Sequence, residues 1–146
     1  MDLLDKMLGR EKNQQVAPTL MEDIPKAAEW FQEAMDSSGY TLDGTLESFQ
    51  EVDRFVEEQG RPGGVLQSDL RGKILFGMGS YIGQTLIAQL GGQWETNDAD
   101  PQGEVNIAVH MNGGTVWPVQ KALKRLINGP EDSIYAYGIA LKRYGK

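Results

Sequence analysis

Residues 68–90 read SDLRGKILFGMGSYIGQTLIAQL and contain the most apolar stretch of the chain. A helix over this range is roughly 35 Å long at 1.5 Å per residue. Because apolar residues occur on nearly every side of it from residue 74 onward, we expect this helix to be buried at the centre of the fold. Serine, threonine and glutamine side chains interrupt the apolar stretch after residue 79, which argues against a membrane span.

Three glycines, at positions 77, 79 and 83, lie in the apolar part of this expected helix. Each glycine costs up to about 1 kcal/mol relative to alanine in a helix interior. We therefore expect another segment to pack closely against the glycine-bearing face. The spacing is GxGxxxG, one residue longer than the dinucleotide-binding GxGxxG, and no βαβ unit is expected around it. The glycines thus indicate close helix packing rather than a nucleotide site.

Helices are expected on both sides of the central segment. Apolar residues at three- and four-residue spacing predict helices over 24–36, 46–58, 118–127 and 131–146. Asp23 is the expected N-cap of the first of these, and Glu131 and Asp132 are expected to open the last. The glycine-rich segment 60–64 contains a proline and is interpreted as a loop between helices.

Three short strands are expected to form an antiparallel meander after the central helix. They are predicted over 93–96, 105–110 and 115–117. The segment Asn112-Gly113-Gly114 is a strong hairpin signal, because these residues tolerate positive φ. Together the elements predict an α+β fold of about four main helices, with the glycine-bearing helix at the centre. Residues 18–146 are expected to form this single domain and residues 1–17 a flexible tail.

The composition excludes several classes of function. The chain has 146 residues, no cysteine, one histidine and a net charge of −7. There is thus no thiol nucleophile, no thiolate metal site and no two-histidine metal motif within one chain. The acidic balance argues against nucleic-acid and membrane partners. Asp2 and Asp5 stand where a signal peptide carries positive charge, so a cytoplasmic location is expected.

No catalytic, cofactor or metal site is predicted. The segment Asp98–Glu104 begins like a calcium-binding loop, but Val109 occupies the position where such a loop needs a bidentate glutamate. His110 ends an expected strand without a recognisable serine, cysteine or metal partner, and a structural role is expected for it. The carboxylate pairs at residues 47/51 and 57/58 lie on one helix face, as solvated surface acids usually do. We therefore expect a protein that is not an enzyme and has no cofactor.

Charge is unevenly distributed along the chain. Residues 121–146 carry a net charge of +4, and residues 1–120 a net charge of −11. The basic end is expected to pair with helix C-termini and with acidic parts of the same molecule. Glu51 on the second helix and Asp98 and Asp100 in the first strand loop are the candidate acidic contacts for a partner.

Two segments carry a resemblance to known domain families. They are Gly79-Ser-Tyr81-Ile-Gly83 and the later Leu90-Gly-Gly-Gln-Trp94. Together with Trp117-Pro118 and the segment 124–133, they resemble a pattern, G-x-Y-[IL]-G followed by L-G-G-x-W, in uncharacterised bacterial domains of unknown function. Some relatives of these families look like immunity proteins near bacterial toxin systems. The resemblance covers about residues 65–137, implies no catalytic residues and makes the glycines and Trp94 scaffold positions.

Two functions are expected from these observations. The first is a bacterial protein-interaction protein that binds a basic partner through its acidic surface, in one version a toxin-neutralising immunity protein. The alternative is a small-ligand domain with a cleft beside the glycine face, lined by Tyr81, Trp94 and Trp117. The two tryptophans are expected to seal the sheet against a helix, with an anchoring role at an interface as the alternative.

Overall fold

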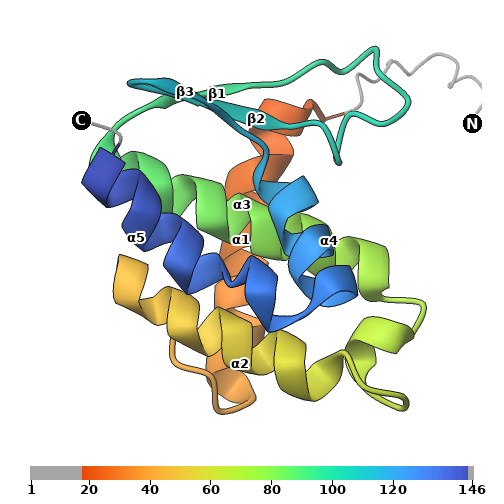
Figure 1. Ribbon diagram of the computed structural model, residues 1–146. Coiled ribbons are helices and arrows are strands. Elements are labelled where there is room, and N and C mark those ends of the chain that lie inside the picture. The colour runs from red at the N-terminus through yellow and green to blue at the C-terminus, as the bar shows by residue number, and fades with distance from the viewer. Residues whose placement is uncertain (1–17, 145–146) are drawn as a thin grey trace, which may run out of the picture.

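The computed structural model describes residues 18–144, which form the α+β fold predicted from the sequence (Figure 1). The prediction of a tail over residues 1–17 lies outside the described range. A three-stranded antiparallel sheet covers one end of a layer of helices (Figure 1). The elements are α1 (Leu20–Ser37), α2 (Phe49–Gln59), α3 (Arg71–Leu90), β1 (Gln93–Glu95), β2 (Ala108–Met111), β3 (Gly114–Val116), α4 (Pro118–Asn128) and α5 (Ile134–Tyr144).

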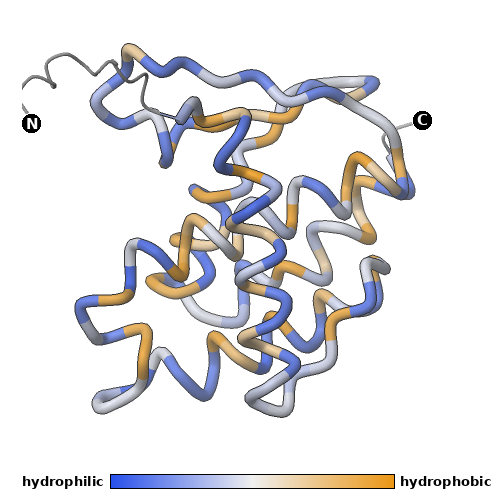
Figure 2. The backbone as a smooth tube through the Cα atoms, turned by 180° about the vertical axis from the view of Figure 1, so that it is seen from behind, coloured by the Kyte–Doolittle hydropathy of each residue, from blue (hydrophilic) through white to orange (hydrophobic). Residues whose placement is uncertain are grey.

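Helix α3 is the central element, as its sequence predicts. Its residues from Ile74 to Gly83 are buried without interruption. It packs mainly on α1 and α4, and the sheet lies against its C-terminal half. Hydrophobic and hydrophilic residues alternate along the surrounding helices, as expected for helices that bury one face (Figure 2). The core is therefore built around α3, and the other helices each contribute one apolar face.

Three of the four glycines of α3, at positions 77, 79 and 83, allow three different neighbours to approach. A Cβ at Gly77 would lie 3.1 Å from the Cβ of Phe31 in α1. One at Gly79 would lie 2.7 Å from the Cα of Val119 in α4, and one at Gly83 would lie 2.6 Å from Cζ2 of the Trp94 ring. The expected close packing is confirmed, but it occurs on two faces of the helix: Gly79 and Gly83 are one turn apart, and Gly77 lies on the opposite side. Each glycine leaves room that a side chain would fill.

The strand register divides the sheet into an inner and an outer face. Trp94, Val109 and Val116 are paired across the three strands and face the helices. The next row, Gln93, His110 and Thr115, is paired in the same way on the solvent side. Because side chains alternate along a strand, this register places Trp117, one residue beyond Val116, on the outer face.

Several expected element boundaries are wrong, and side-chain hydrogen bonds explain the differences. Helix α1 begins after Thr19 rather than after Asp23, because Thr19 and Glu22 form a reciprocal capping box. Strand β2 begins at Ala108 rather than at residue 105. The Asn106 side chain donates to Asp100 and its backbone N–H donates to Gln102, so this part of the chain remains in a turn.

The start of α5 also differs from the prediction. Glu131 and Asp132 lie in a short 3₁₀ turn, and α5 begins at Ile134. The cap comes from α2, since the Asp53 carboxylate accepts hydrogen bonds from the backbone N–H groups of Ile134 and Tyr135 at 2.8 and 3.0 Å. The Asp53 carboxylate of α2 therefore caps the N-terminus of α5, a role expected for Glu131 and Asp132.

Within residues 18–144, no helix combines the length and the apolar character needed to cross a bilayer.

Candidate functional site

The outer face of the sheet carries a line of polar side chains across all three strands. His110 on β2 contacts the Glu95 carboxylate on β1 through Nε2, and its Nδ1 lies 2.9 Å from the Thr115 hydroxyl on β3. All three residues lie on the solvent side of the sheet. A carboxylate, an imidazole and a hydroxyl in line can relay or orient a proton. Here the Glu95 and His110 side chains are more than half exposed, so water competes for their hydrogen bonds. These three residues therefore form a polar surface on the sheet.

A shallow groove of about 270 Å³ runs beside this line. Trp117 lies at its edge with 46% of its surface exposed, while Asp100 and Asn106 line it from the β1–β2 loop. An exposed tryptophan is costly to leave in water and is a common anchor at protein interfaces. The exposure of Trp117 thus favours the alternative role of an anchor at an interface over the expected role of sealing the sheet against a helix.

Three carboxylates, that of Asp100 among them, lie in the β1–β2 loop. Asp98, Asp100 and Glu104 surround a second depression, which shares Asp100 with the groove. The Asp98 carboxylate accepts a 2.8 Å hydrogen bond from the backbone N–H of Leu20, at the start of α1. Hydrogen bonds from the Asn106 side chain and the Gln102 N–H lower the pKa of Asp100. These bonds hold Asp98 and Asp100 in place, and those to Asp100 favour its charged form.

We define the acidic sheet face as Glu95, Asp98, Asp100, Glu104 and Trp117. The chain has no lysine or arginine from residue 74 to residue 120, so neither residue type balances these four carboxylates within the same segment. In the described part of the chain, none of them forms an ion pair with a lysine or arginine. The gap in basic residues is visible in the sequence and was the signal that could have located this face.

The acidic side of α2 differs, because its charges are balanced within the molecule. Arg54 pairs with Glu51 at 2.8 Å and with Glu58 at 3.4 Å, and the hydrogen bond from Arg54 lowers the pKa of Glu51. Glu57 lies 3.2 Å from Arg125 of α4. Glu51, predicted as a partner contact, is thus occupied by a cation of its own helix and lies on a different element from Asp98 and Asp100.

Asp53, expected on the solvated side of its helix, is in fact partly buried. Its carboxylate contacts Arg125 of α4 at 3.1 Å and the Ser133 hydroxyl at 2.8 Å, besides capping α5. The Arg125 side chain is only 6% exposed. Lys121 pairs with Asp132 in the same region at 3.3 Å. Two cations of the basic C-terminal segment, Lys121 and Arg125, therefore pair with acids of the same molecule.

The three glycines expected to line a cleft are covered by Phe31, Val119 and Trp94. Tyr81 is 4% exposed, and its hydroxyl contacts the Ser48 hydroxyl at 2.6 Å and accepts from the Gly44 N–H at 2.9 Å. Trp94 packs on Gly83 and seals the sheet against α3, while Trp117 is on the opposite face. The three aromatic residues predicted to share a ligand site are thus separated.

Within residues 18–144, no group of three histidine or carboxylate side chains is placed to hold a metal ion.

No family model, no curated protein and no solved structure matches the chain.

Proposed function

We propose that this protein is a binding protein without enzymatic activity, and that the acidic sheet face binds a basic partner protein. The observation that carries the proposal is the combination of one exposed tryptophan with four carboxylates in a segment without lysine or arginine. Interfaces commonly combine an aromatic anchor with a polar rim. Unbalanced carboxylates beside the anchor attract basic side chains and raise the rate of association.

Of the two acidic surfaces that the sequence suggested, the sheet face supports binding better. The carboxylates of α2 are paired with Arg54 and Arg125, so a basic partner would have to displace those cations. The sheet-face carboxylates form no such pairs within the described residues, and Asp98 and Asp100 are already held by hydrogen bonds. A surface ordered before binding loses less conformational freedom in the complex.

The test is affinity capture with the immobilised full chain, from host lysate and from cells that co-express neighbouring gene products. We expect one basic protein at a one-to-one ratio, released by moderate salt because exposed charges are screened. Trp117→Ala and Glu104→Lys should each reduce its retention at least about tenfold. A toxin as the captured protein would identify the immunity version of this function.

Two matched variants distinguish binding at this face from non-specific association through surface charge or exposed apolar side chains. Glu47→Lys makes the same charge change on the α2 side, and Ile127→Ala removes an apolar side chain that is 65% exposed at the end of α4. Both should retain the partner as the unmodified chain does. If no stoichiometric partner is found, or if Trp117→Ala and Ile127→Ala behave alike, the proposal is wrong.

A further inference from the structure

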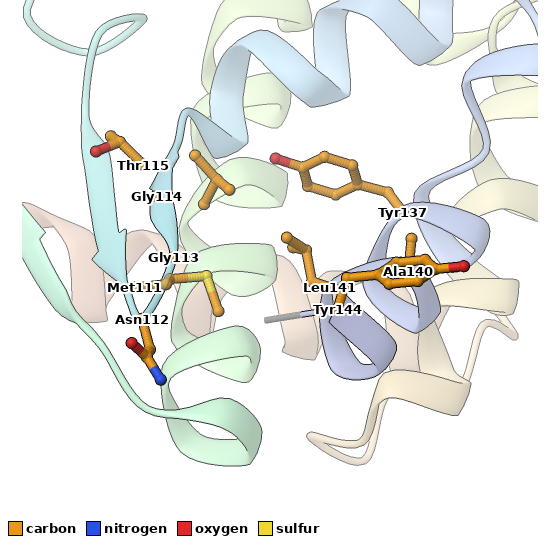
Figure 3. Close-up of a pocket in the computed structure, with 10 residues that line it drawn as sticks. Met111, Asn112, Gly113, Gly114, Thr115, Tyr137, Ala140, Leu141 and Tyr144 are labelled. Atoms are coloured by element: carbon orange, nitrogen blue, oxygen red, sulfur yellow. The ribbon is translucent and has the colours of Figure 1, made fainter. Parts of the chain in front are cut away.

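A pocket of about 360 Å³ lies between the β2–β3 hairpin and α5 (Figure 3). We call it the hairpin pocket; its lining residues are Met111–Val116 on the hairpin and Tyr137, Ala140, Leu141 and Tyr144 on α5. Met111 points from the hairpin toward α5, and Tyr137 and Leu141 point back toward the sheet (Figure 3). The volume is more than twice the roughly 150 Å³ of an engineered apolar cavity that binds benzene.

The lining favours an uncharged occupant. None of its residues carries a charge, and most of the wall is contributed by Met111, Val116 and Leu141 with the two tyrosine rings. A charged ligand would lose its hydration here without an opposite charge to replace it. Gly113 and Gly114 keep the hairpin side open, since a Cβ at either position would meet no atom within 4 Å.

Tyr137 supplies one polar group at the pocket. Its ring reaches from α5 toward β3 (Figure 3). The Lys121 ammonium lies 4.9 Å from the ring centre. Among the described residues, its hydroxyl forms no hydrogen bond with another side chain or with the backbone. Burial raises the pKa of Tyr137 to about 12, so the hydroxyl keeps its proton at neutral pH and can donate it.

We propose that the hairpin pocket binds a small, uncharged and mostly apolar molecule with one hydrogen-bond acceptor, such as an aromatic ketone, ester or amide. The apolar walls would remove its rings or chain from water, and the Tyr137 hydroxyl would donate to its carbonyl oxygen. The size, the absence of charge in the lining and the Tyr137 donor all point to this class. This site is separate from the proposed protein interface and does not depend on it.

The experiment uses PRODAN, a neutral naphthalene ketone whose emission shifts to the blue in apolar surroundings. Titration of the full chain should give saturable binding at one site with blue-shifted emission. In a ¹H–¹⁵N correlation spectrum, the amide signals of Gly113 and Gly114 should shift with the same affinity. Absence of saturable binding up to the solubility limit of PRODAN would overturn the proposal, and so would shifts confined to other parts of the molecule.

Matched variants locate the site on α5. Ala140→Phe fills the pocket from an exposed position and should weaken PRODAN binding about tenfold or more. Ala136→Phe makes the same change one turn earlier, at an exposed residue outside the pocket, and should leave the affinity within about twofold. Tyr137→Phe keeps the ring, removes the donor and should weaken binding about fivefold. Equal affinity in the two phenylalanine variants would contradict the site, provided that both unfold at the same urea concentration as the parent chain.

Discussion

The Asp53 carboxylate joins three segments that are far apart in the sequence. It contacts Arg125 of α4, the Ser133 hydroxyl and the first N–H groups of α5. Because one side chain satisfies a buried cation and a helix N-terminus together, its loss leaves several groups without partners. Hydrophobic periodicity cannot reveal such a residue, since Asp53 lies between the apolar positions of α2 like any surface acid.

We expect Asp53→Asn to lower the free energy of unfolding by about 2–4 kcal/mol, because it leaves the Arg125 charge buried beside a neutral amide. Urea unfolding of the two proteins measures this difference. Glu57→Gln is the matched control: Glu57 also contacts Arg125, but it is half exposed, so its loss should cost less than about 1 kcal/mol. Equal costs for the two variants would show that Asp53 has no special role.

At the scale of elements, the contact between α3 and α4 depends on the absence of a side chain at Gly79. A Cβ there would overlap the backbone of Val119, which cannot move aside as a flexible side chain can. The helix penalty of this glycine is therefore offset by close helix packing. Gly72, in the first turn of the same helix, serves no such purpose, because a Cβ at that position would meet no atom within 4 Å.

The two glycines should respond to alanine with opposite signs. Gly79→Ala should destabilise the fold by about 1–3 kcal/mol, because α4 must shift. Gly72→Ala should stabilise it by about 0.5–1 kcal/mol through better helix propensity. Thermal and urea unfolding measure both effects. A stabilising Gly79→Ala variant would mean that α3 and α4 can separate at little cost.

Burial of Tyr137 between α5 and the hairpin makes stability depend on pH in the alkaline range. Its pKa is about 12 in the folded protein, against about 10 for a free tyrosine. Above pH 10 the unfolded chain therefore loses this proton while the folded chain keeps it. The stability that the protonated Tyr137 contributes is complete below pH 10 and is lost as the pH rises from 10 to 12.

Replacement of Tyr137 by phenylalanine should therefore reduce the loss of stability between pH 10 and pH 12. The measurement is the urea midpoint at a series of pH values for both proteins. Burial and a hydrogen bond to Glu58 also raise the pKa of Tyr40, but Tyr40 is present in both chains and cancels in the comparison. Parallel pH profiles for the two proteins would contradict the assignment of a raised pKa to Tyr137.

For the whole molecule, the distribution of charge matters more than its sum of −7. Acids of α2 are paired with Arg54 and Arg125, whereas the acidic sheet face lies in a segment without lysine or arginine. The field that a basic partner meets should therefore be concentrated at the sheet end of the molecule. This separation follows from the tertiary fold, which brings α4 to α2 and leaves the sheet at one end (Figure 1).

A decalysine peptide tests this distribution without knowledge of the natural partner. In a ¹H–¹⁵N correlation spectrum at low salt, the peptide should shift amide signals of residues 95–104 and of Trp117. Signals of residues 49–59 should move less, and all shifts should fall sharply in 0.5 M NaCl, where charges are screened over a few ångströms. Larger shifts on α2 than on the sheet would contradict the proposed distribution.

Local patterns were sufficient to predict much of the fold. The central helix, the amphipathic helices, the Gly113 hairpin and the α+β class follow from periodicity and turn chemistry, which depend on neighbours in sequence. Helices α2 and α3 begin three residues later than predicted, and the starts of α1, β2 and α5 also differ, where side-chain hydrogen bonds determine the boundary. Two of the three involve partners six or fewer residues away, and the third involves Asp53, about 80 residues away.

The sequence by itself determined which segments are helical and which are extended, because backbone preference and apolar spacing are local properties. Only the tertiary structure decided which acids are neutralised and which tryptophan is buried. The strand register, set by packing against α3, places Trp94 inside and Trp117 outside. Likewise, only folding brings Arg125 to Asp53 and leaves the sheet carboxylates without basic partners in residues 18–144, since these contacts join segments that are distant along the chain.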